Sequence, residues 1–215
     1  MSDDRVFRPA SRTVFDTPFL SALLRTASRL MFRLLGWRFD GRIPADLAQA
    51  VVIGAPHTSN WDLPYALMAA FAQGRTLHWL GKQQIFRFPF GGLMRWLGGI
   101  PVDRSRSNNL VDAAVRCFAI REQPLLLLVP PEGTRSQVRQ WKTGFYYIAL
   151  GAGVPVLMAY MDHSTRICGV RKLFHPGGDI EADMVAIRAY YSPFRGWARR
   201  DDRADGLAAN KETSG

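Results

Sequence analysis

The sequence of 215 residues is poor in cysteine and in acidic side chains, and it has no long uninterrupted apolar run. Its two cysteines, Cys117 and Cys168, lack a CxxC partner, so neither a disulfide framework nor a zinc finger is expected. The most apolar stretch near the N-terminus, Pro18–Gly36, contains three arginines, whereas a membrane-spanning helix needs about 20 mostly apolar residues. The first ten residues also lack the charged-then-apolar order of a secretory signal, so we expect a cytoplasmic protein.

The shortage of acids leaves a strongly positive chain. There are 28 Lys and Arg against 18 Asp and Glu, which gives a formal net charge of +10. Residues 71–106 hold six of these basic residues and one acid, together with many Phe, Trp, Leu and Gly. A basic surface can bind anionic lipid, a phosphorylated substrate or nucleic acid. Because the sequence has no recognisable nucleic-acid-binding motif, we expect no nucleic-acid partner.

Short apolar runs alternate along the chain with segments of helical periodicity. The predicted strands are 50–55, 76–80, 99–102, 124–129 and 154–160. The predicted helices between and after them are 61–73, 108–121, 142–151 and 181–191. This alternation predicts a single α/β domain over 49–198, with a mostly parallel central sheet flanked by helices. Residues 199–215 are polar, and a disordered tail is expected there.

Pro18–Gly36 predicts an amphipathic helix ahead of this domain. Arg25, Arg29 and Arg33 are spaced by four and share one stripe, while leucines recur at three-four spacing on the other side. Such a helix can lie in a bilayer interface. The alternative is a surface helix that packs its leucines on the core. Residues 85–97 interleave aromatics with arginines, which favours a second bilayer-facing segment over a core helix.

A histidine and an aspartate lie where the first predicted strand meets its helix, a place where α/β folds build sites. Residues five apart point about 140° apart on an ideal helix. His57 and Asp62 can therefore meet only if His57 precedes the helix and Asp62 lies in its first turns. A carboxylate on one imidazole nitrogen lets the other take a proton from a hydroxyl. The alternatives are an ordinary surface pair and a metal site completed by His78, His163 or His175, which lacks a recognised ligand spacing.

Polar residues also follow two other predicted strands. Arg104 comes just after 99–102, and the turn Glu132-Gly133-Thr134-Arg135 comes after the most apolar strand, 124–129. Arginines and turn amides at strand ends suit phosphate binding, and Lys142 can add a point charge. For Arg104, a surface pair with Asp103 is the alternative.

These motifs occur in a specific order: HxxxxD at 57–62, GGIPVDR at 98–104, PEGTRS at 131–136 and a Val-Pro strand at 154–156. The combination resembles the glycerolipid acyltransferase family, the PlsC type, which includes the 1-acylglycerol-3-phosphate acyltransferases. The likeness extends from about Val51 to Ala159.

The resemblance implies a role for each matching residue. His57 is implied as the general base and Asp62 as its orienting partner. The implied ligands of the acceptor's phosphate are Arg104, Glu132, Gly133 and Arg135, to which we add Thr134 and Lys142 as candidate substrate-binding residues.

The resemblance also implies a reaction. A fatty acyl group moves from an acyl thioester, on acyl-carrier protein or coenzyme A, to a hydroxyl of a lysolipid, and no metal or cofactor is needed. The expected acceptor is 1-acyl-sn-glycerol-3-phosphate, which gives phosphatidate; a lyso-ornithine lipid, a lysophospholipid or another hydroxyl is an alternative. A non-catalytic basic membrane-binding module is the alternative of another class. We expect residues 1–48 to attach the acyltransferase domain, residues 49–198, peripherally to anionic lipid at the inner face of the cell membrane.

Overall fold

A computed structural model describes residues 9–55, 61–102, 107–120, 123–131 and 141–194. Its centre is a seven-stranded sheet with the strand order β1-β7-β6-β2-β5-β3-β4. The five parallel strands are β2 (Gln49–Ala55), β3 (Leu77–Lys82), β4 (Gly99–Val102), β5 (Leu125–Leu128) and β6 (Val156–Asp162). The two strands that run opposite to them are β7 (Ile167–Phe174) and β1 (Arg38–Asp40). The predicted mostly parallel sheet is therefore confirmed.

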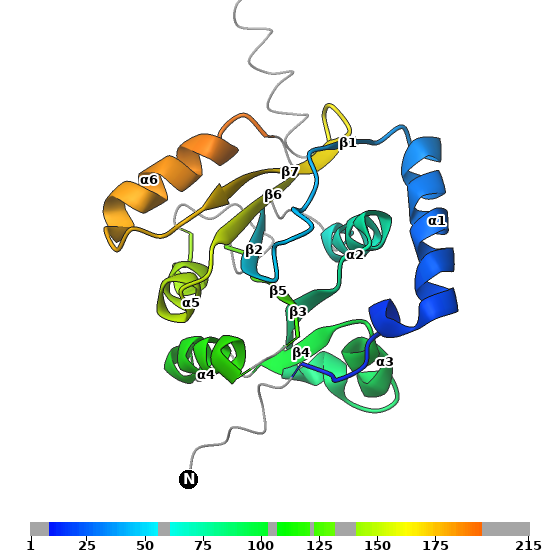
Figure 1. Cartoon of the computed structure of the whole chain (residues 1–215), viewed down its shortest axis with the longest axis horizontal. Helices are drawn as coiled ribbons and strands as arrows, with labels where there is room; N and C mark the ends of the chain where they lie inside the picture. The colour runs from blue at the N-terminus through cyan, green and yellow to red at the C-terminus, as the bar shows by residue number, and fades with distance from the viewer. Residues whose placement is uncertain (1–8, 56–60, 103–106, 121–122, 132–140, 195–215) are drawn as a thin grey trace, which may run out of the picture.

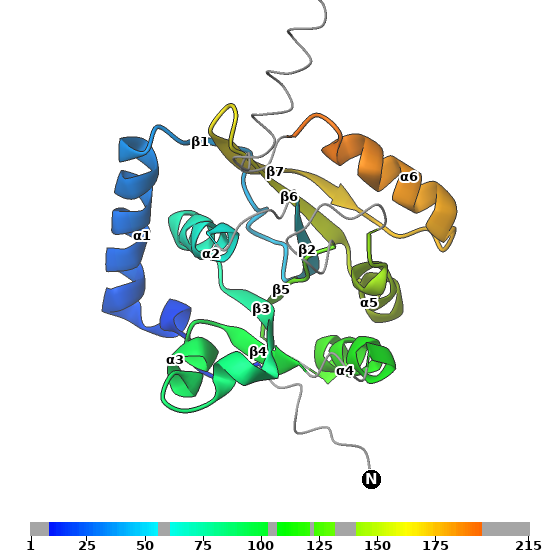
Figure 2. The ribbon, with the colours of Figure 1, turned by 180° about the vertical axis from the view of Figure 1, so that it is seen from behind.

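Helices cover both faces of this sheet (Figures 1 and 2). One face carries α4 (Ser107–Ile120), α5 (Gly144–Ala152) and α6 (Ile180–Tyr191). On the other face, α2 (Asp62–Gln73) lies between the sheet and α1 (Pro18–Leu34). The remaining elements are α3 (Gly91–Trp96) and the short 3-10 helices η1 (Val14–Asp16) and η2 (Gln83–Phe86).

The face covered by α4, α5 and α6 holds the larger apolar core. The side chains of Phe145, Tyr146 and Ile148 on α5 are at most 1% exposed, and they pack against the inward side chains of the central strands. Tyr191 anchors α6, because its hydroxyl lies 3.0 Å from the carbonyl oxygen of Ile53 and 2.8 Å from that of Ala159. This layer is therefore tied to two neighbouring strands by both packing and polar contacts.

The predicted N-terminal helix is confirmed, and the structure also shows which way it faces. The buried side chains of α1 are Ser28 and Phe32, which lie between the arginine and leucine stripes. Leu23, Leu30 and Leu34 point outward and are 64%, 54% and 72% exposed. Packing of the leucine stripe on the core is therefore wrong for these three residues, which leave an apolar strip on the surface.

The strand predictions differ from the structure at several boundaries and at one edge of the sheet. β3 and β6 each run two residues beyond the predicted carboxyl end, and β6 also starts two residues later. β1 and β7 were not predicted at all, although together they extend the sheet at one edge. β1 lies within the segment 1–48 that was expected to hold the membrane-associating helix.

Candidate active site

The parallel strands bring their carboxyl ends to one edge of the sheet, which is where the sequence motifs were expected to meet. Asp62 is the first residue of α2, the next helix along the chain after β2, so it lies in the first turn of the helix as predicted. Six other predicted site residues lie outside the described part of the chain, and their roles stay predictions: His57, Arg104, Glu132, Gly133, Thr134 and Arg135.

Asp62 lies in the first turn of α2, where the positive end of the helix dipole favours a carboxylate. Its side chain is only 13% exposed, and its Oδ1 atom lies 3.8 Å from Nε2 of His163. α2 ends at Gly74, whose φ of 70° turns the chain back toward β3. The carboxylate is thus fixed at the sheet edge by the start of a well-bounded helix.

Lys142 also lies at this edge. Its backbone N–H donates a hydrogen bond of 2.7 Å to the carbonyl oxygen of Pro131, at the end of β5. The neighbouring Trp141 packs against Tyr191, with ring centroids 5.4 Å apart. These contacts bring both ends of the segment that contains the Glu132–Arg135 turn together, and the Lys142 side chain is exposed beside them.

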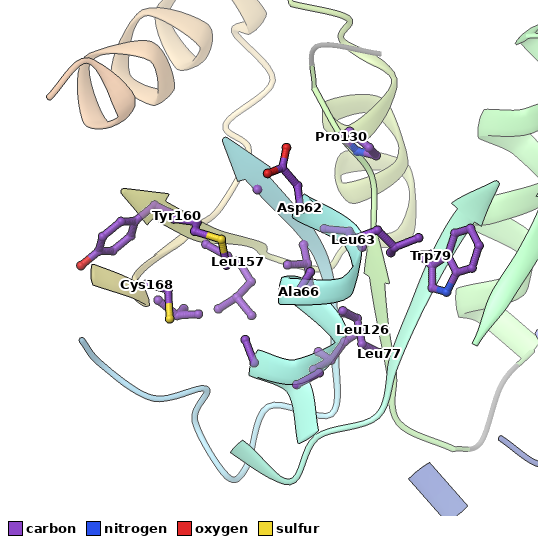
Figure 3. Close-up of a pocket in the computed structure, with 18 of the residues that line it drawn as sticks. Asp62, Leu63, Ala66, Leu77, Trp79, Leu126, Pro130, Leu157, Tyr160 and Cys168 are labelled. Carbon is purple, nitrogen blue, oxygen red and sulfur yellow. The ribbon is translucent and has the colours of Figure 1, made fainter. Parts of the chain in front are cut away.

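An apolar pocket of about 560 Å³ lies between α2 and the sheet. Figure 3 shows Asp62 and Pro130 at the end where β2 and β5 finish, with the Asp62 carboxylate pointing away from the apolar lining. Leu77, Leu126 and Leu157 line its deeper part. Along β3 the lining runs from Leu77 to Lys82, a length of roughly 17 Å at the rise of an extended strand.

Small side chains create the space. Ala66, Ala69 and Ala70 line the pocket from α2, and Gly54 lines it from β2. A Cβ atom at Gly54 would make only an ordinary contact of 3.9 Å with Leu128, so the space there is open. The sequence analysis missed this pocket, although the three-four spacing of alanines on the predicted helix was a usable signal.

Hydrogen bonds connect the residues at the end of the pocket opposite Asp62. Gln73 accepts a 2.8 Å hydrogen bond from the backbone N–H of Ile43, and both residues line the pocket. Arg75, which also lines it, donates to the carbonyl oxygens of Ala45 and Leu47. Residues 43–47 are therefore held against the chain at the end of α2.

One side wall contains a fixed polar group. Tyr160 lines the pocket and donates a hydrogen bond to Asp40, which also accepts from Arg171. Burial, followed by the bond to Asp40, raises the pKa of Tyr160 well above its usual range. The bond from Tyr160, together with Arg171, outweighs burial and lowers the pKa of Asp40. Near neutral pH the Tyr160 phenol therefore stays protonated and the Asp40 carboxylate stays charged. Their hydrogen bond holds Tyr160 in the side wall of the pocket.

Cys168 lines the same side of the pocket. Burial raises the pKa of its thiol to about 12, so almost no thiolate forms at neutral pH. A covalent mechanism through this cysteine is therefore disfavoured.

Residues 38–162 match the family model described as Acyltransferase. The chain belongs to the acyltransferase family.

Relatives of this acyltransferase chain carry a consistent name. Over 150 residues it is 31% identical to the 1-acyl-sn-glycerol-3-phosphate acyltransferases of Salmonella typhimurium and of Escherichia coli K12, covering 65% of this chain and 59% of each relative. The human 1-acyl-sn-glycerol-3-phosphate acyltransferase beta is 27% identical over 80% of this chain and 68% of its own length. The chain thus spans about three fifths of the bacterial relatives.

The fold of this acyltransferase chain also has a solved counterpart. The crystal structure of the 1-acyl-sn-glycerophosphate (LPA) acyltransferase PlsC from Thermotoga maritima superposes with a TM-score of 0.56. The match covers 82% of this chain and 78% of that one at 16% identity, which establishes a shared fold.

The metal site considered from the sequence would include His57, which lies outside the described residues. Across the ranges that the structure describes, no three His, Cys, Asp or Glu side chains come together in a way that could hold a metal ion. Among the same residues, no helix of this acyltransferase chain has both the length and the apolarity to cross a membrane. His163 does approach Asp62, which the sequence analysis considered only as part of a metal site.

Proposed function

We propose that this chain is an O-acyltransferase that moves a fatty acyl group from an acyl thioester to a hydroxyl of a lysolipid. The observation that carries the proposal is the apolar pocket, which opens beside Asp62 at the sheet edge where the motif residues are expected. Its volume of about 560 Å³ and its length suit a long aliphatic chain with its reactive end at Asp62. Acyl-carrier protein or coenzyme A is the proposed carrier.

In the proposed reaction, His57 removes the proton of the acceptor hydroxyl while its oxygen attacks the thioester carbonyl carbon. A carbon–oxygen bond forms, the carbon–sulfur bond breaks, and the proton passes to the leaving thiolate. Asp62 orients His57 and stabilises its protonated form. General-base catalysis of this kind contributes about 10²-fold to 10⁴-fold, and no metal or cofactor is needed for it.

We propose 1-acyl-sn-glycerol-3-phosphate as the acceptor and phosphatidate as the product. Arg104, Glu132, Gly133, Thr134 and Arg135 are the proposed ligands of the phosphate, with Lys142 as a further point charge. Two observations support this choice. The bacterial and human relatives carry this substrate in their names, and a hydrogen bond joins Lys142 to Pro131, the described residue just before Glu132.

We also propose peripheral attachment to the inner face of the cell membrane, through one apolar and basic side of the molecule. α1 and α3 lie on the same side in both views (Figures 1 and 2). Phe19 on α1 is 93% exposed and Phe88, just before α3, is 98% exposed. Arg87 and Arg95 are exposed and lie on either side of Phe88 in the sequence, as suits an anionic bilayer surface.

The catalytic proposal is tested with purified protein, acyl-carrier-protein and coenzyme A thioesters, and a panel of acceptors. The panel contains 1-acylglycerol-3-phosphate, lyso-ornithine lipid and lysophospholipids, and free thiol is measured together with the lipid product. We expect release that depends on the phosphate acceptor and is lost in His57→Ala. The proposal is contradicted if thiol release is the same with and without each acceptor, or if it persists in His57→Ala.

The membrane proposal is tested by co-sedimentation with vesicles that contain or lack anionic lipid. Changing Leu23, Leu30 and Leu34 together to Gln should abolish binding, because the outward apolar strip is lost. Val185→Gln is the matched control, since Val185 is 65% exposed on α6, on the opposite side of the sheet. Undiminished binding by the triple variant contradicts this proposal.

A further inference from the structure

His163 lies beside the proposed catalytic carboxylate although it comes from a distant part of the sequence. It directly follows β6, so it reaches the same sheet edge as the start of α2. Its Nε2 atom is 3.8 Å from Oδ1 of Asp62, and the two side chains are 8% and 13% exposed. At this distance a direct hydrogen bond is too long, but a charge interaction or a bridging water fits.

Aromatic side chains hold the His163 ring in one orientation. Trp37 and Tyr65 both meet it edge to face, at centroid distances of 5.1 and 6.1 Å and interplanar angles of 87° and 84°. The turn around it is fixed as well, because Asp162 accepts hydrogen bonds from the backbone N–H and the hydroxyl of Ser164 at 2.9 and 2.7 Å. The imidazole is therefore preorganised beside Asp62.

If His163 served only to pack against the aromatic rings, its ring nitrogen would have no reason to face the Asp62 carboxylate. A carboxylate has two oxygens and about four acceptor positions, so one aspartate can serve two imidazoles at once. The Oδ1 atom of Asp62 lies near His163. From the HxxxxD motif, His57 is the other expected partner of the Asp62 carboxylate.

We infer that His163 is a positioning residue for acyl transfer: it fixes the orientation of the Asp62 carboxylate and, through it, the general base His57. This inference rests on the proposed function. His163 is not among the residues that line the apolar pocket. Misplacing reacting groups by about 1 Å can cost roughly 10²-fold in rate, so loss of this support should lower kcat without weakening substrate binding.

The test compares His163→Phe, His163→Gln and His175→Gln, the last at an exposed histidine away from the pocket. Phe keeps the aromatic packing and removes the nitrogens, whereas Gln restores an N–H donor near Asp62. We expect His163→Phe to keep the melting temperature and both KM values while kcat falls about 10-fold to 100-fold. Gln should recover part of kcat, and His175→Gln should match the wild type.

Wild-type kcat in His163→Phe overturns the inference. So does a loss of kcat that Gln does not relieve, or one that parallels the melting temperature in both variants. If His163→Phe does not fold, His163→Leu, which also lacks a side-chain nitrogen, replaces it under the same criteria. Because every variant is compared with active wild type, this outcome is separate from failure of the proposed function, in which the wild type itself shows no acceptor-dependent thiol release.

Discussion

The two faces of the central sheet are built differently. The face under α4, α5 and α6 is filled by large buried side chains such as Phe145 and Tyr146. The face under α2 has a smaller buried cluster and is hollowed by the pocket, where alanines replace the large residues. Because packing density determines what a core contributes to stability, we expect the filled face to stabilise the fold and the hollow face to bind substrate.

The largest expected effect tests the filled face. Phe145→Ala removes a side chain that is 1% exposed, and it should lower the free energy of unfolding by about 3–5 kcal/mol. Leu150→Ala, on the same helix but 40% exposed, should cost less than about 1 kcal/mol. Denaturant unfolding measures both variants. An equal cost at the two positions would mean that this face is not the stabilising core.

On the hollow face, Asp62→Asn should separate activity from stability. The neutral amide cannot stabilise a protonated histidine, so kcat should fall roughly 10²-fold to 10³-fold. Stability should change by less than about 1 kcal/mol, the usual value of a charge in the first turn of a helix. Steady-state kinetics and thermal unfolding are compared with those of the exposed Asp46→Asn. A large loss of stability in Asp62→Asn would mean that the hollow face also stabilises the fold, against the proposed difference between the two faces.

A smaller, pH-dependent effect is expected at the sheet edge where the faces meet. Burial opposes the charged form of Asp162, but hydrogen bonds from Ser164 and Thr165 outweigh it and keep its pKa below the usual value. Its stabilisation is therefore present above the unfolded pKa of about 4 and is lost as the pH falls through the lower folded pKa.

Asp162→Asn should accordingly destabilise the protein by roughly 1–2 kcal/mol at pH 7. The unfolding curves of variant and wild type should converge below about pH 4. Denaturant titrations at several pH values measure the difference. A gap that stays constant into acid would assign the effect to packing instead of charge.

The smallest effect sharpens the role of the pocket. Gly54→Val adds a side chain where the nearest atom to a new Cβ lies 3.9 Å away, so the fold should tolerate it. The pocket becomes smaller, and the preferred acyl chain should shorten. Each methylene that no longer fits loses about 0.8 kcal/mol, or about fourfold in affinity. Competition between thioesters of different length measures the shift, with Gly54→Ala as a graded control. An unchanged length preference would place the acyl chain elsewhere.

Local patterns predicted the five parallel strands, including β4 at one edge of the sheet, but not β1 and β7 at the other edge. β2 and β4 are apolar runs buried on both faces, so their sequences alone are enough to predict them as strands. β1 has only three residues, and β7 places the exposed Arg171 and Lys172 in mid-strand. β1 forms by pairing with β7, and β7 by pairing with β6 as well, and such pairing partners are not visible in a local pattern.

The candidate site, too, could be predicted only in part from local sequence patterns. The position of Asp62 at the start of α2 followed from local spacing and is confirmed. The meeting of Asp62 with His163 depends on which strands are neighbours, and the pocket depends on how far α2 stands from the sheet. Periodicity predicted an amphipathic α1, yet only the fold shows that Leu23 and Leu30 face outward.

The aromatic contacts around His163 continue into α1, with a practical consequence for anyone who shortens this protein. Phe32 is fully buried and meets Trp37 and Tyr65 at centroid distances of 6.3 and 6.1 Å. Deleting the N-terminal helix to test the proposed membrane attachment would remove Phe32 along with the leucines, so Trp37 and Tyr65, which contact His163, would lose an aromatic neighbour. The proposed attachment is better tested by substituting the exposed leucines of α1 while Ser28 and Phe32 are kept.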